Sequence, residues 1–310
     1  MGARVRLAVL FAVILALFVV IGGLVGEFLL GSWLLGLLIA LSLSLVLNLV
    51  SYFYCDRLIL WSTKAKIVTA EQAPRLAKIV DELAPIFHLE APRLAIVPTP
   101  TPNAFATGRD EKHAVVAATE GILQVLNDRE LRGVLAHELA HIRDRDILVM
   151  TFAATVAGAI SYAAQIAFFS MFFGGSGNRN NVNPIVLLLA LVTAPIAAML
   201  VQLAISRSRE FRADEVGAAT IGDPDSLASA LQKLEVANVR RPMSTGSPAQ
   251  SSLFIVNPFR GASFASIFST HPATAERVRR LRAMRTDYRY RPNVRGPSAR
   301  SGSSPVATRV

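Results

Sequence analysis

The chain has 310 residues, 52% of them hydrophobic, and a formal net charge of +10. Its apolar residues gather in long runs rather than recurring periodically, which argues against an ordinary soluble domain and favours an integral membrane protein. No aromatic-interleaved basic motif accompanies the positive charge, so nucleic-acid binding is a weak alternative. The single cysteine, Cys55, excludes an internal disulfide and, at a membrane boundary, is more typical of packing than of chemistry.

Two pairs of apolar stretches are each long enough to cross a hydrocarbon core of about 30 Å as helices. They are residues 6–26, 29–54, 147–174 and 183–206. We therefore predict four transmembrane helices, arranged as two hairpins covering residues 1–55 and 147–206. The first stretch follows Arg4 and Arg6 as a signal peptide would. Because a second span follows within a few residues and no clear small-residue cleavage site intervenes, we expect it to be retained.

The distribution of lysine and arginine predicts the orientation in the membrane. With a cytoplasmic N-terminus, 31 of the 32 basic residues lie inside and only Arg179 lies outside, as the positive-inside rule requires. The rule therefore predicts a multi-pass protein of the cell (inner) membrane. Its N-terminus, both soluble segments and its C-terminus are expected to face the cytoplasm. The basic charge is then explained by topology and by attraction to anionic lipid headgroups.

The first soluble segment covers residues 56–146 and contains both helical and extended patterns. We predict helices at residues 72–89, 120–126 and 128–145, and short strands at residues 93–97 and 114–118. The stretch "PTPTPNAFATG" is a Pro-rich turn that leads into an extended piece at residues 103–107. Asn127, followed by Glu130 three residues later, predicts a capping box at the start of the third helix.

The second soluble segment covers residues 207–286. We predict helices at residues 224–238 and 274–284. Residues 241–270 are rich in Ser, Gly and Pro and are expected to form a long mobile loop. Residues 287–310 carry many Arg, Ser, Gly and Pro residues and few apolar ones, which predicts a disordered basic tail.

The stretch "AHELAH" contains two histidines that suggest a metal site. On a helix, His137 and His141 are displaced by only about 40° around the axis and about 6 Å along it, so both rings can reach one ion. Glu138 projects to the side of this pair, where it can act as a general base on a water molecule, as peptide hydrolysis requires. The alternative is a pair of solvated histidines on a surface helix.

A third ligand must lie on the same side of the membrane, and two predicted crossings return the chain there after His141. In "SRSREFRADE" a continuing helix would place Glu210 and Asp214 on one face and Glu215 away from it. We choose Glu210 as the ligand because its longer side chain reaches further, which leaves Asp214 to hydrogen-bond a ligand imidazole. The alternative is a solvated acidic pair among the neighbouring arginines.

These motifs together resemble a known family. The HExxH helix, the inserted hairpin, "REFRAD", "PNAFATG" at 102–108 and "STHPATAERVRRL" at 269–281 are similar to those of the HtpX-type zinc-dependent membrane metallopeptidases, the heat-shock protease HtpX family. A more distant likeness is to the CAAX prenyl proteases. The resemblance covers most of the chain from about residue 60 to residue 282. The segment "HIRDRD" departs by carrying more charge than expected of the family, which leaves the fit of Asp144 and Arg145 open.

The resemblance implies a mainly α protein with a zincin-like (gluzincin) α+β catalytic domain that contains a small sheet and is built from residues 56–146 and 207–286. It implies a zinc-dependent endopeptidase that degrades misfolded or damaged membrane proteins at the cytoplasmic face. One Zn²⁺ per chain would be bound by His137, His141 and Glu210, with Glu138 in catalysis. The expected partners are polypeptide substrates and the lipid bilayer, without nucleic acid.

Asn103, Ala104 and Phe105 are candidates for substrate contacts. The extended piece that contains them lies upstream of the metal helix and could pair with a peptide by strand addition, through backbone hydrogen bonds that tolerate many sequences. The alternative is an ordinary hairpin strand in which Asn103 serves as a turn residue after Pro102.

His271 and Arg277 are candidates for the positive or hydrogen-bonding group that faces a developing oxyanion. His271 could equally be a local cap or a surface residue, and Arg277 could lie on a solvated helix face. Asp146 stands before the third predicted span, where capping that helix is the simpler interpretation.

Two other functions remain open at this point. One is processing of prenylated C-termini by a CAAX prenyl protease, although that chemistry usually needs more than four spans. The other is a non-catalytic metal-binding membrane scaffold.

Overall fold

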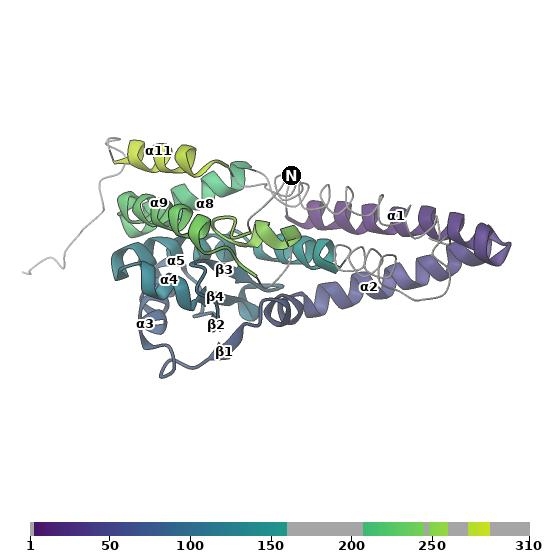
Figure 1. Ribbon diagram of the computed structural model, residues 1–310, viewed down its shortest axis with the longest axis horizontal. Helices are drawn as coiled ribbons and strands as arrows, with labels where there is room; N and C mark the ends of the chain where they lie inside the picture. The colour runs from purple at the N-terminus through teal and green to yellow at the C-terminus, as the bar shows by residue number, and fades with distance from the viewer. Residues whose placement is uncertain (1–2, 160–206, 245–247, 260–271, 286–310) are drawn as a thin grey trace, which may run out of the picture.

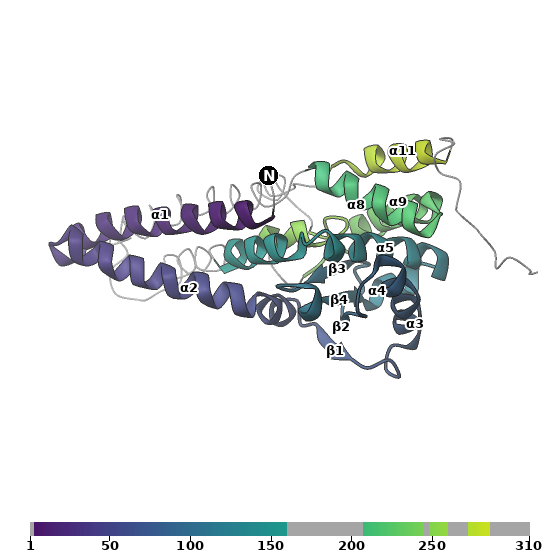
Figure 2. The same ribbon diagram turned by 180° about the vertical axis from the view of Figure 1, so that it is seen from behind.

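The computed structural model describes residues 3–159, 207–244, 248–259 and 272–285. It is mainly helical with one small mixed sheet (Figure 1), which confirms the predicted mixture of α and β structure. A long hairpin of α1 (Ala3–Leu30) and α2 (Trp33–Ser62) projects from the body that contains the sheet, as the view from behind also shows (Figure 2).

The distribution of residues in the hairpin is the reverse of that in a soluble protein, with apolar side chains outside. From Trp33 to Tyr54, the buried positions of α2 are small or polar, among them Gly36, Ser44 and Asn48, while most of the leucines are exposed. A Cβ atom added to Gly26 would lie 2.4 Å from the Cα atom of Gly36, so glycine allows the two helices to approach closely. Small residues between helices and leucines outside are typical of helices that pack within lipid.

Among the described helices, α2 is the one long and apolar enough to cross a membrane. Shorter apolar helices cover Val5–Val20, within α1, and Ile147–Ala159, at the start of the predicted third span. The rest of the second predicted hairpin, residues 160–206, lies outside the described residues. Four transmembrane helices therefore remain a prediction.

The sheet has the strand order β1-β2-β4-β3. Its strands are β1 (Lys66–Val68), β2 (Arg93–Val97), β3 (Ala104–Thr107) and β4 (Val115–Thr119). The two inner strands are parallel, and each edge strand is antiparallel to its neighbour. The strand at residues 93–97 was predicted correctly, and the second predicted strand is shifted by one residue.

The helices around the sheet follow in chain order. They are α3 (Pro74–Leu83), α4 (Glu120–Val125), α5 (Asp128–Arg143), α8 (Arg207–Ile221), α9 (Pro224–Arg240) and α11 (Thr274–Met284), with short 3-10 helices η1 (Ala84–Phe87), η2 (Glu111–His113) and η3 (Pro248–Leu253). The single helix expected at residues 72–89 is therefore two elements, because Pro85 lies in the second and His88 ends it with a φ of 58°.

Both faces of the sheet are covered, which explains why every residue of β3 and β4 is buried. Alternate residues point to opposite faces. Val116 and Ala118 of β4 pack in the core formed with α5, α8 and α9, whereas Val115 and Ala117 pack on the bases of α1 and α2 and on Ile147–Ala159. The sheet thus joins α5, α8 and α9 to the apolar hairpin.

Helix α5 lies in the middle of the body and is buried over most of its length. The predicted capping box is confirmed: the Asn127 side chain accepts from the Glu130 backbone N–H at 2.9 Å, and Glu130 accepts from the Asn127 N–H at 3.1 Å. The box satisfies donors that the first turn of a helix would otherwise leave free.

The prediction of a long mobile loop at residues 241–270 is wrong for its described central part. Residues 250–256 are buried, and the ring of Phe254 lies 5.2 Å from that of Phe105, centroid to centroid. The apolar "LFIV" outweighs the Ser- and Pro-rich surroundings because it covers the outer edge of β3. Residues 260–271, including His271, and the tail at 287–310 lie outside the described residues.

Gly217 on α8 sets how closely that helix approaches α5. A Cβ atom at this position would lie 3.0 Å from the backbone nitrogen of His137. We expect Gly217→Val to lower the free energy of unfolding by about 1–3 kcal/mol, because overpacking pushes the two helices apart. Thermal unfolding in detergent measures this, and Ala219→Val on the exposed face of α8 is the matched control. Equal stability of the two variants would contradict the close packing.

Candidate metal centre

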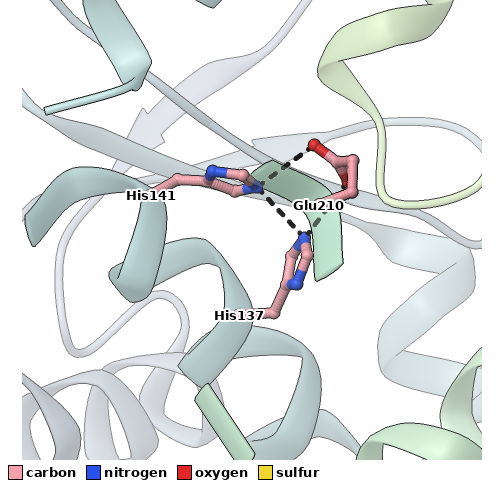
Figure 3. Close-up of side chains that lie close together, drawn as sticks. All are labelled: His137, His141 and Glu210. Carbon is pink, nitrogen blue, oxygen red and sulfur yellow. Dashed lines mark hydrogen bonds and ion pairs between the residues drawn. The ribbon is translucent and has the colours of Figure 1, made fainter. Parts of the chain in front are cut away.

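Three buried side chains from two separate segments converge beside the sheet (Figure 3). His137 and His141 lie one turn apart on α5, and Glu210 reaches them from α8. One ligand atom of each lies within 4.8 Å of the others, and this is the one such cluster among the residues that the structure describes. These are the three residues that the sequence predicts as metal ligands.

The distances within the cluster fit a single ion. The Nε2 atoms of His137 and His141 are 3.2 Å apart, and they lie 3.8 Å and 3.5 Å from the two carboxylate oxygens of Glu210. Ligand atoms about 2.0–2.1 Å from a tetrahedral zinc ion are separated by roughly 3.3 Å. The cluster therefore has the donor types and the spacing of a zinc site with room for a further ligand.

Burial favours the neutral ring of His141 that metal binding requires. The three side chains are at most 4% exposed. Burial lowers the pKa of His141 to about 3, so its ring is neutral at physiological pH. For His137, burial also favours the neutral ring, but the hydrogen bond and the charge of Asp214 together raise its pKa above the ordinary value. A proton therefore competes with a metal mainly at His137.

Asp214 has the position predicted from the sequence. Its Oδ1 lies 2.9 Å from Nδ1 of His137, on the side of the ring away from Glu210. Burial opposes ionisation of Asp214, but the charge and hydrogen bonds of Arg277 keep its pKa below the usual range. Such a carboxylate fixes the tautomer and the orientation of a metal-binding imidazole.

Arg277 makes contacts that the sequence pattern did not indicate. Its Nε and Nη2 donate to the two oxygens of Asp214 at 2.8 and 2.7 Å, and Nη1 donates to the Ile255 carbonyl at 2.7 Å. The guanidinium thus supports Asp214, which in turn contacts His137. The sequence suggests Arg277 as a group that faces the oxyanion, whereas the structure pairs it with Asp214. The two residues are 63 positions apart, so no local spacing indicates this pairing.

Glu138 lies on the sheet side of α5. The residue is 3% exposed, and its carboxylate accepts a hydrogen bond of 2.8 Å from the Ala106 N–H on β3. Burial raises the pKa of Glu138 to about 7; the charge of His137 opposes this rise and that of Glu210 adds to it. A carboxylate with a pKa near neutrality is suited to accept and release a proton.

The three predicted substrate contacts are buried against residues 254–256. The Asn103 side chain donates to the Val256 carbonyl at 2.6 Å, the Ala104 carbonyl accepts from the Ile255 N–H at 3.3 Å, and Phe105 packs on Phe254. With the Ala106 N–H bonded to Glu138, much of the outer edge of β3 already has partners. Strand addition at this edge would require some of these contacts to open.

A comparison with family models and curated proteins adds to this geometry. A model described as peptidase family M48 matches residues 70–285, which include every residue of the cluster. The chain belongs to peptidase family M48. Members of this family are zinc-dependent, so the chain is a zinc metalloprotease.

Several curated relatives that match over most of the chain carry the name "Protease HtpX homolog", which confirms the resemblance to HtpX-type peptidases. The protein of Pyrococcus furiosus is 50% identical over 282 residues, 91% of this chain and 96% of its own. That of Syntrophobacter fumaroxidans is 47% identical over 288 residues, 92% of this chain and all of its own. Among solved structures, Ste24p of S. mikatae is 18% identical with a TM-score of 0.43, covering 86% of this chain and 61% of that one.

Proposed function

We propose that this M48 peptidase is a membrane-embedded zinc endopeptidase that cleaves misfolded or damaged membrane proteins at the cytoplasmic face. The observation that carries the proposal is the meeting of His137, His141 and Glu210 within 4.8 Å. These residues come from segments separated by the predicted hairpin at residues 147–206, so the fold has to bring them together.

Zinc suits the site better than magnesium or calcium. Two imidazoles and one carboxylate with an open position are typical of catalytic zinc, whereas magnesium and calcium prefer sites made of oxygen ligands. When bound, zinc supplies the Lewis acidity that polarises a carbonyl group and makes water more acidic.

The protein's own contribution to the reaction centres on Glu138. Its carboxylate lies beside the ligand pair and can take the proton from the attacking water and pass it to the leaving amine. Burial holds the carboxylate in a low-dielectric environment, and the Ala106 N–H fixes its direction. The hydrogen bond to Ala106 also ties the catalytic group to β3, the strand we propose for substrate binding.

Binding to β3 would explain a broad choice of substrates, since main-chain hydrogen bonds do not depend on side-chain identity. Asn103, Ala104 and Phe105 would contact the substrate once the segment at residues 254–256 has moved away from part of the β3 edge. His271 stays a candidate for a contact to the oxyanion. Arg277, whose guanidinium donates to Asp214 and to the Ile255 carbonyl, would act only through the charge that it places behind His137.

The membrane placement is supported by the hairpin. Trp33 and Tyr54 of α2 are both exposed and 21 positions apart, about 32 Å along a helix, which matches the thickness of a hydrocarbon core. Aromatic residues of this kind gather at both membrane interfaces. The sheet packs directly on the base of the hairpin. A membrane around the hairpin would therefore lie close to the cluster, where unfolded segments of membrane proteins emerge.

We expect Glu138→Gln to retain zinc and to reduce proteolysis by about 10²–10⁴-fold, because the amide cannot accept the proton. Cleavage of casein and of an unprenylated membrane protein, together with zinc content by mass spectrometry, measures both effects. The exposed Glu120→Gln is the matched control. Undiminished cleavage by Glu138→Gln would refute its role, and cleavage insensitive to a chelator would point away from a metal-dependent peptidase.

The pH profile should reflect the ionisation of Glu138. The carboxylate must be deprotonated to act as a base, so kcat/KM should fall as the pH drops through its pKa. Burial raises that pKa from 4.5 to about 7, and the positive charge of zinc lowers it again, so the acid limb should lie between these values. Steady-state rates from pH 4.5 to 9, with zinc content checked at each pH, test this. Rates that rise toward acid pH while zinc is retained would contradict it.

The proposed orientation can be tested by thiol labelling after the buried Cys55 is replaced by alanine. In intact spheroplasts, a membrane-impermeant maleimide should label Ser32→Cys, between α1 and α2, but not Glu90→Cys in the soluble body. Permeabilisation should expose the second site. The reverse pattern would place the metal cluster on the outer side of the membrane.

A further inference from the structure

Two ion pairs join the end of α5 to the start of α8, from arginines on either side of Glu210. Asp146 accepts from Nη1 of Arg209, and Asp144 accepts from Nε of Arg212, each at 2.7 Å. The pairs differ in burial: the Arg209 side chain is 8% exposed and that of Arg212 is 66% exposed. We refer to them as the inner pair and the outer pair. The inner pair alone lies beside the metal cluster.

The second oxygen of Asp146 faces a metal-site imidazole. Oδ2 lies 4.0 Å from Nδ1 of His141, and within the described part of the chain no other carboxylate comes as close to that nitrogen. Nδ1 of His141 is buried without a hydrogen-bond partner among these residues. An imidazole that binds a metal through Nε2 carries its proton on Nδ1 and needs an acceptor there. A tilt of the ring or of the Asp146 side chain by about 1 Å would supply one.

The groups around Nδ1 of His141 repeat those around Nδ1 of His137. Nδ1 of His137 faces Asp214, which is held by Arg277; Nδ1 of His141 faces Asp146, which is held by Arg209. In both cases the arginine and the histidine come from opposite sides of the predicted hairpin. The same set of arginine, aspartate and histidine therefore occurs twice, with a nitrogen–oxygen distance of 2.9 Å at His137 and 4.0 Å at His141.

Stability alone does not explain the inner pair. Arg209 uses Nη1 on Asp146, while its Nε and Nη2 are buried without a partner among the described residues. Burying an arginine with unpaired donors is unfavourable, and replacing buried ion pairs with apolar residues often stabilises proteins. A buried pair of this kind beside an active site indicates a role in the site.

We propose that Asp146 and Arg209 are positioning residues for the metal ligands. Asp146 accepts the hydrogen bond from Nδ1 of His141 when that ring binds zinc. Arg209 holds Asp146 in place and, as the residue before Glu210, ties the third ligand to the same carboxylate. The inference rests on the proposed function in one respect, that His137, His141 and Glu210 bind zinc.

The test compares neutral replacements of the two pairs. Asp146→Asn with Arg209→Met removes the inner pair without leaving a buried charge alone, and Asp144→Asn with Arg212→Met does the same to the outer pair. Asp214→Asn is the positive control. For each protein, the zinc dissociation constant is measured by chelator competition, the cobalt-substituted site by its visible absorption, and the zinc-free fold by thermal unfolding.

Loss of the inner pair should weaken zinc binding by about 10–100-fold, as is usual when the partner of a ligand histidine is lost, and should alter the cobalt spectrum. The zinc-free protein should unfold at nearly the wild-type temperature. Loss of the outer pair should change zinc affinity by less than about twofold, since exposed ion pairs contribute little. Asp146→Asn with Arg209→Gln keeps polar side chains at both positions without a buried charge, and it should show the same weakening if the methionine variant does not fold.

Wild-type zinc affinity in the inner-pair variants would overturn the proposal. An equal loss in the outer-pair variant would also overturn it, because both pairs would then act only by tethering α5 to α8. A wild-type protein that binds no zinc would overturn the proposed function itself, and this inference with it. The zinc measurement on the wild-type protein therefore distinguishes failure of the proposed function from failure of this inference alone.

Discussion

The contact between α5 and α8 is the constraint on which the site depends. Each helix carries part of the metal cluster, and neither segment could assemble it alone. Gly217 lets α8 approach the backbone of His137, so the longer carboxylate of Glu210 reaches both imidazoles. The sheet, α9 and the segment at residues 254–256 hold this pair of helices in place. The rigid surroundings suit a cluster whose ligands must keep their spacing to within a few tenths of an ångström.

Burial has two opposite effects around this contact. It keeps His141 neutral and raises the pKa of Glu138, both of which serve hydrolysis. It also makes every charge near the site unfavourable unless a partner is present. Arg277 with Asp214, and Arg209 with Asp146, are the partners that the structure provides. The charged groups thus form a shell behind the ligands, and their arrangement is better explained by the chemistry of the site than by stability.

The membrane side of the protein follows from the same sheet. One face of β4 contributes to the core of the catalytic helices, while the other packs on α1, α2 and Ile147–Ala159. Because side chains alternate between the two faces of β4, this strand joins the peptidase body to an apolar hairpin that exposes most of its leucines. The charge of Arg6 on α1 also acts on Asp146, so a residue of the hairpin contributes to the electrostatics of the inner pair.

The sequence by itself determined the local parts of this protein: the helix that carries His137, Glu138 and His141, its capping box and the apolar hairpin. These follow from spacings of a few residues, which helix geometry converts directly into neighbouring side chains. Only the tertiary structure decided that Arg277 supports Asp214, that Arg209 pairs with Asp146, and that residues 254–256 cover β3. The paired arginines and aspartates are 63 positions apart, and no local periodicity reports which buried charges will face each other once the helices pack.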